Sequence, residues 1–137
     1  MSDDAEKRIR AELKRLSAGG QVADLIIDAA PRRAVIYRQV PCLLGSGYPS
    51  AMDVLVPVPE GYPASNIDGA GLHQGDDLFL RLAGGSNPQG AFQAEGLDWV
   101  LASYHPHAGG GGPPWDPTRH GFHTYLDHLV AWLAVIK

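Results

Sequence analysis

The sequence predicts an α+β fold in one domain spanning residues 1–137, with a helix near each end and an antiparallel sheet between them. Apolar residues recur at helical spacing at both ends of the chain. Between them, runs rich in β-branched and aromatic residues follow one another with short connections, as in an antiparallel meander. The 17 glycines and 11 prolines gather mainly between these segments. With 137 residues, the chain is long enough to bury a core of its own.

The first helix is expected from about Asp3 to Leu16, because its apolar side chains fall on one face. That face comprises Ala5, Ile9, Leu13 and Leu16. Ser2 can serve as the N-cap, and the glycine pair at 19–20 ends the helix. Its basic residues are Lys7, Arg8, Arg10, Lys14 and Arg15. Because Glu6 and Glu12 are interleaved with them, we interpret this charged face as solvated rather than as a phosphate-binding patch.

Strands are expected over Val22–Ala29, Ala34–Val40 and Met52–Val58, with Leu78–Leu82 as a possible fourth. Short turns between the first three favour an antiparallel meander of about four strands. Apart from the fourth strand, residues 60–96 are interpreted as mostly loop, and Trp99–Ala102 as a further short apolar piece. Gly109–Pro114 cannot form regular structure.

The last helix is expected over residues 120–136, which carry a clear amphipathic pattern. Its apolar positions are Phe122, Leu126, Leu129, Val130, Leu133 and Ile136. Among them, Leu126, Leu129 and Leu133 should all be buried on one face.

Composition and charge narrow the range of partners. The hydrophobic share of 45%, the charged share of 19% and the net charge of −4 give no sign of a nucleic-acid or membrane partner. The single cysteine, Cys42, excludes an internal disulfide and a CxxC motif, and it suits a reducing compartment. No apolar run reaches the roughly 20 residues that span a bilayer. The N-terminus has no apolar segment typical of a secretory signal, so we expect a cytoplasmic protein.

Two short motifs stand out in the sequence. The segment 54–63 reads Val-Leu-Val-Pro-Val-Pro-Glu-Gly-Tyr-Pro, and Trp115-Asp116-Pro117 is followed closely by an amphipathic helix. The first resembles the third strand and Tyr-Pro turn of the ubiquitin-conjugating (UBC) family, and the second resembles that family's Trp-x-Pro motif. In particular, the chain resembles the prokaryotic UBC-like family found beside tandem ubiquitin-like proteins, activating enzymes and metallo-deubiquitinases. The resemblance runs from about Gly20 to the C-terminus and implies a ubiquitin-like protein and its activating enzyme as partners, with no cofactor.

The chain departs from that family at the catalytic position. In conjugating enzymes the catalytic cysteine lies about eight residues before the tryptophan. Here that position is His107, with His105 two residues earlier, and the family's His-Pro-Asn signature is reduced to Asn87-Pro88. A thiolate carries an acyl group well, whereas an acyl-imidazole hydrolyses quickly. The resemblance therefore implies a docking component with little or no thioester chemistry, since Cys42 maps to the second strand or the turn after it.

The candidate catalytic residues are His105 and His107, which are suited to general acid–base chemistry. The candidate partner-binding residues are Tyr62, Tyr104 and Trp115. We expect both histidines to lie close to Trp115, beneath the glycine–proline loop. Two alternatives remain open: an active transferase or hydrolase that uses these histidines, perhaps with Cys42, and a binding module unrelated to ubiquitin.

Metal and nucleotide sites are not expected. His105, His107, His120 and His123 supply four imidazoles, but no cysteine or carboxylate completes a familiar spacing, and Arg119 lies beside them. The glycine run 109–112 lacks the strand, lysine and helix of a phosphate-binding loop.

Overall fold

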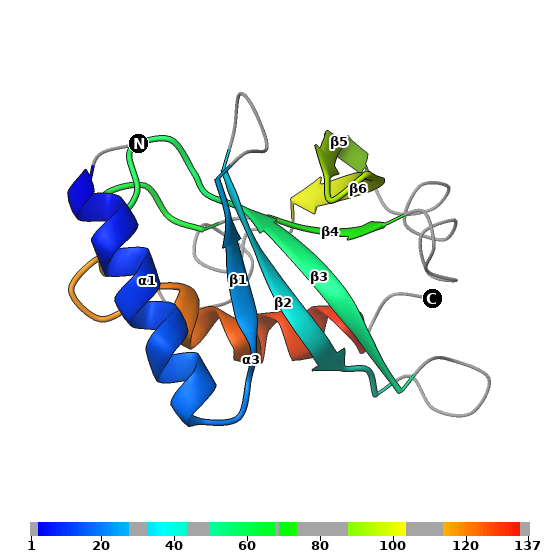
Figure 1. Ribbon diagram of the computed structural model, residues 1–137, viewed down its shortest axis with the longest axis horizontal. Coiled ribbons are helices and arrows are strands. Elements are labelled where there is room, and N and C mark those ends of the chain that lie inside the picture. The colour runs from blue at the N-terminus through cyan, green and yellow to red at the C-terminus, as the bar shows by residue number, and fades with distance from the viewer. Residues whose placement is uncertain are drawn as a thin grey trace.

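The computed structural model describes residues 3–27, 33–43, 50–67, 69–73, 88–103 and 114–134. Its elements are α1 (Asp3–Ala18), β1 (Ala23–Ile26), β2 (Ala34–Pro41), β3 (Ala51–Pro57), β4 (Gly69–His73), β5 (Pro88–Ala94), β6 (Leu97–Ser103) and α3 (Phe122–Leu133). The six strands form one antiparallel sheet in the order β1-β2-β3-β4-β6-β5 (Figure 1). The predicted α+β class, with a helix before and after an antiparallel sheet, is confirmed.

The sheet contains strands that the sequence did not predict. β4 and β5 lie within residues 60–96, where the only strand expected was Leu78–Leu82; Trp99–Ala102 belongs to β6. The expected strand Leu78–Leu82 lies outside the described residues. β4 reads Gly-Ala-Gly-Leu-His and has little intrinsic preference for a strand. A Cβ atom on Gly71 would lie 2.6 Å from Leu101 Cδ2 and 2.8 Å from the Val100 carbonyl oxygen, so pairing with β6 requires glycine there.

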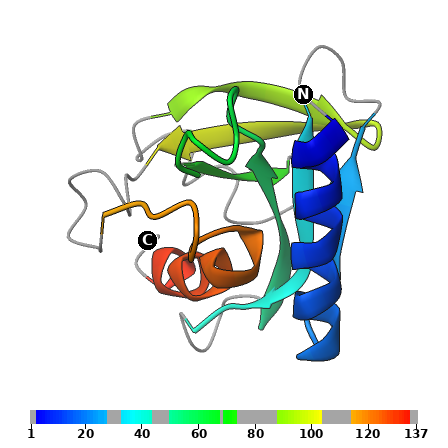
Figure 2. The same cartoon turned by 90° about the vertical axis from the view of Figure 1, so that its left-hand side faces the viewer.

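Both helices cover the same face of the sheet. Figure 2 shows α1 and α3 packed beside each other against the strands. Their shared core includes Ile9 of α1, Tyr37 of β2, Val54 of β3 and Leu129 of α3. This burial of the helices' apolar faces holds the two ends of the chain together.

The sheet curls, so that strands β5 and β6 cover the opposite face of β2 and β3. Ala34, Ile36 and Leu55 form a second core there with Trp99 and Leu101. Because β2 is covered on both faces, residues 34–37 are all fully buried, and the usual alternation of apolar and polar residues is absent.

Arg38 of β2 forms ion pairs that connect the β5–β6 turn to strand β1. Its Nη1 and Nη2 donate to the two carboxylate oxygens of Glu95 at 2.9 Å each, and its Nε donates to Asp24 at 2.9 Å. Glu95 and Gly96 have φ values of 56° and 75°, as the tight two-residue turn of a hairpin requires. The hydrogen bond from Arg38 lowers the pKa of Glu95, so the pair remains charged well below neutral pH.

The C-terminal helix is shorter than predicted, and its buried face is centred on different residues from those expected. It begins at Phe122 and ends at Leu133, and residues 135–137 are outside the described part of the chain. Leu129 and Leu133 are fully buried as expected, but Leu126 is only half-buried, which corrects the prediction for that residue. Tyr125 and Trp132 are buried as well, and they move the centre of the apolar face away from Leu126. Neither described helix is long and apolar enough to cross a membrane.

Candidate functional site

The two motifs that resemble the UBC family lie in direct contact. The Tyr62–Pro63 turn follows β3, and its peptide bond is cis. The Trp115 indole Nε1 donates a hydrogen bond of 2.9 Å to the carbonyl oxygen of Pro63. The rings of Tyr62 and Trp115 are 6.2 Å apart. Segments 52 residues apart in the sequence are therefore joined at one site.

Tyr62 forms the inner side of this site. Its side chain is 5% exposed, and its ring packs 5.2 Å from that of Phe122. The hydroxyl donates a hydrogen bond of 2.6 Å to Glu12 Oε1. Burial, together with the neighbouring Glu12 carboxylate, raises the pKa of Tyr62, so this hydroxyl stays protonated. Tyr62 supports the turn from within and leaves little surface for a partner, whereas Trp115 is only half-buried.

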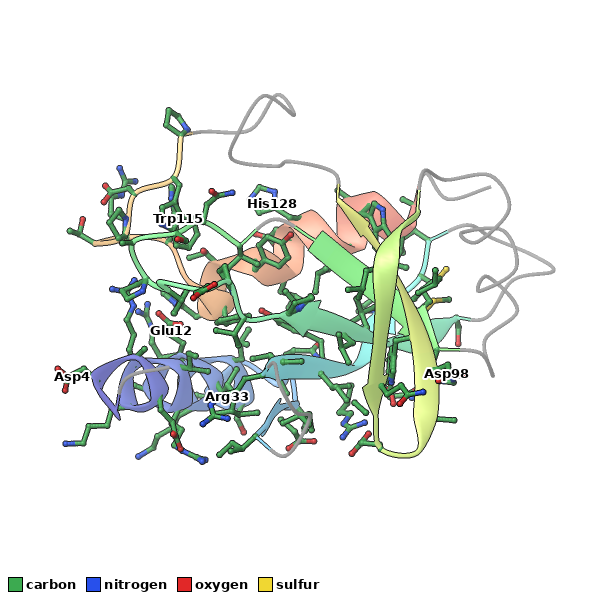
Figure 3. The ribbon with its side chains drawn as sticks, turned by 90° about the horizontal axis from the view of Figure 1, so that it is seen from above. Asp4, Glu12, Arg33, Asp98, Trp115 and His128 are labelled. Atoms are coloured by element: carbon green, nitrogen blue, oxygen red, sulfur yellow. The ribbon has the colours of Figure 1, made fainter. Side chains whose placement is uncertain are left out.

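Glu12 of α1 connects three segments (Figure 3). It is 5% exposed, so its interpretation as part of a solvated helix face was wrong. Oε1 accepts hydrogen bonds from the Tyr62 hydroxyl and, at 3.2 Å, from the backbone N–H of Phe122, the first residue of α3. Oε2 accepts a hydrogen bond of 2.9 Å from Arg8 Nε. A carboxylate at this helix N-terminus interacts favourably with the free N–H groups there.

Arg8 balances the charge of this carboxylate. Besides its contact with Glu12, it donates through Nη2 to the carbonyl oxygen of His120 at 2.8 Å. Its guanidinium lies 5.7 Å from the centre of the Tyr62 ring. Burial lowers the pKa of Arg8, but the hydrogen bond and charge of Glu12 outweigh that effect and raise it overall. The buried carboxylate is therefore paired, as a buried charge must be.

The turn that carries Trp115 has its own hydrogen bonds. The backbone N–H of Asp116 donates to His120 Nδ1 at 2.9 Å, which places the proton of a neutral His120 ring on Nε2. Asp116 Oδ1 accepts from the backbone N–H and the hydroxyl of Thr118, and these bonds lower the pKa of Asp116. The rings of Trp115 and His120 are 5.7 Å apart. The half-buried ring of Trp115 is thus held by its hydrogen bond to Pro63 and lies beside the imidazole of His120.

Gly121 allows the turn to approach α1. A Cβ atom built there would lie 2.6 Å from Glu12 Cδ. Its backbone is extended, with φ of −177°, so the requirement is for space rather than for an unusual conformation.

Several predicted residues cannot be placed at this site. His105, His107 and Tyr104 lie outside the described residues, so their predicted proximity to Trp115 remains a prediction. Cys42 follows the end of β2, as expected; it is 7% exposed and belongs to the core beneath the helices. Within the described ranges, no three histidine, cysteine or carboxylate side chains are grouped to hold a metal ion.

Glu12 was missed because charged residues in a helix are usually solvated. One signal was available: residue 12 lies seven positions after Ala5 and three after Ile9, on the apolar face of the helix. Comparison with protein-family models, curated proteins and solved structures finds no match to this chain.

Proposed function

We propose that this chain is a UBC-like component of a bacterial ubiquitin-like modification pathway, which docks a ubiquitin-like protein or its activating enzyme without carrying it as a thioester. The observation that carries this proposal is the hydrogen bond between Trp115 and Pro63. The two motifs on which the resemblance depends lie in contact, which supports treating them as one site. The helix, the first three antiparallel strands and the final helix also follow in the order that the resemblance implies.

The position of Cys42 supports a docking role rather than a carrier role. A carrier thiol must be reached by the activating enzyme's thioester and must ionise readily. Cys42 is only 7% exposed and packs among apolar core residues, so an activating enzyme could not reach it. A buried cysteine of this kind behaves as a small apolar residue.

The half-buried ring of Trp115 is the proposed contact with the partner. Its indole N–H is occupied by Pro63, so the ring offers an apolar surface whose orientation is already fixed. Preorganised aromatic residues of this kind often dominate binding energies at protein interfaces.

The test is isothermal titration calorimetry with a bacterial ubiquitin-like protein and with its activating enzyme. Trp115→Ala should weaken binding by about tenfold or more. Trp115→Phe keeps an aromatic ring but loses the bond to Pro63, and it should retain more affinity. Val22→Ala is the matched control, because Val22 is an apolar side chain that is 54% exposed outside this site. The proposal would be contradicted if the chain binds neither protein, or if Trp115→Ala and Val22→Ala weaken binding equally.

A further inference from the structure

A groove of about 540 Å³ separates α1 from the turn that leads into α3. Arg8, Glu12 and Arg15 line it from α1, and Arg119 and His123 line it from the other side. Glu12, which accepts hydrogen bonds from Arg8, Tyr62 and Phe122, forms part of the groove wall.

The groove carries a local positive charge in a chain whose net charge is −4. Arg8 and Glu12 form an ion pair of 2.9 Å and cancel. Arg15 and Arg119 are exposed, and their guanidinium groups make no hydrogen bond or ion pair to any residue that the structure describes. Arg15 and Arg119 therefore line one concave surface from its two walls, and the charge of Arg119 also acts on Asp116, whose pKa it helps to lower.

His123 adds a polar atom that lacks a partner. Its Nδ1 is buried and makes no hydrogen bond among the described residues. It lies 3.8 Å from Glu12 Oε2, which is too long for a hydrogen bond. Because the His123 side chain lines the groove, its ring is placed to sense a charge bound there.

We propose that this groove binds a phosphoryl group, as free phosphate or as a small phosphate monoester, between Arg15 and Arg119. A phosphate monoester carries a charge of about −1.5 to −2 at neutral pH, which matches the charge of the two arginines. Guanidinium groups bind phosphate oxygens through paired, charge-assisted hydrogen bonds. The sequence favoured a solvated face on α1 over a phosphate-binding patch, and this proposal departs from that interpretation. Its reason is that Glu12 is buried and pairs with Arg8, so it does not pair with Arg15.

His123 provides the readout. Burial lowers its pKa, as do the positive charges of Arg15 and Arg8, while Glu12 opposes them. A bound dianion would offset the arginine charges, so the pKa of His123 should rise on binding. Its imidazole resonances can be followed by NMR while inorganic phosphate replaces sodium chloride at constant ionic strength and pH.

We expect saturable shifts of the His123 resonances with a dissociation constant on the order of 1 mM. Arg15→Gln and Arg119→Gln should each weaken binding by about tenfold. Arg10→Gln is the matched control: it removes the same charge from α1, but Arg10 pairs with Glu6 and does not line the groove. Thermal unfolding of each variant establishes that the fold is retained.

Glycerol 3-phosphate distinguishes the two sources of the phosphoryl group. Tighter binding than that of inorganic phosphate assigns the groove to an ester, and equal or weaker binding assigns it to free phosphate. Shifts that do not saturate, or an equal loss of affinity in Arg10→Gln, would overturn the proposal, because either result indicates general charge screening rather than a site.

Discussion

Replacing Glu12 by alanine should destabilise the protein strongly, because one buried carboxylate satisfies several groups at once. The substitution leaves the Tyr62 hydroxyl and the Phe122 backbone N–H without their acceptor. Each buried donor left unsatisfied costs about 1–3 kcal/mol, so the two together cost about 2–6 kcal/mol. Arg8 adds little, because its side chain is 30% exposed and can be hydrated. The loss is a large fraction of the roughly 5–15 kcal/mol that stabilises a typical domain.

Urea denaturation, followed by tryptophan fluorescence, measures this effect. With an m value of about 2 kcal/mol/M, the midpoint should fall by about 1–3 M. Glu6→Ala is the matched control, since Glu6 lies on the same helix and pairs with Arg10 at the surface; its loss should stay below about 1 kcal/mol. A double-mutant cycle with Tyr62→Phe should show coupling between the two side chains. Equal losses for Glu12→Ala and Glu6→Ala, or no coupling, would refute the assigned role of Glu12.

Three further predictions concern the core and the sheet. Leu129→Ala should cost about 2–5 kcal/mol in thermal or chemical unfolding, and half-buried Leu126→Ala clearly less; equal costs would show that the helix face is assigned wrongly. Because the folded-state pKa of Glu95 is lowered by Arg38, its contribution to stability is present above its unfolded pKa of about 4.3 and is lost as the pH falls through the folded value. The difference in stability between the wild type and Glu95→Gln should accordingly shrink on acidification, and a constant difference would contradict the ion pair. Cys42 should react slowly with a thiol reagent in the native protein and rapidly in urea; rapid native reaction would place the thiol at the surface.

The helices and the first three strands were predictable because local pattern and final burial agree. In α1, the residues at helical spacing, such as Ile9 and Leu13, are those that enter the core. In β2, a continuous apolar run is long enough to indicate a strand, even though the pattern does not show that both of its faces are covered. Such segments carry their structural signal within a few residues of sequence.

The remaining features depend on contacts between distant segments. β4 pairs with β6 at a position where Gly71 leaves room for the neighbouring strand. Nothing in the local sequence of β4 indicates that a strand will lie so close to it. Glu12 is buried because Tyr62 and Phe122, far away in the sequence, supply its hydrogen bonds. For the candidate site, sequence reasoning named Trp115 and Tyr62, and the structure brings the two into contact. Their role in partner binding stays a prediction, and the Tyr62 side chain lies largely in the core.

The proposed docking role is tested most directly by one incubation of the protein with ATP, a bacterial ubiquitin-like protein and its activating enzyme, analysed by size-exclusion chromatography, non-reducing gels and intact mass. We expect the chain to co-elute with the ubiquitin-like protein or with the enzyme and to keep its unmodified mass. A reductant-sensitive adduct that disappears in Cys42→Ser would contradict this role, as would elution of the chain apart from both proteins.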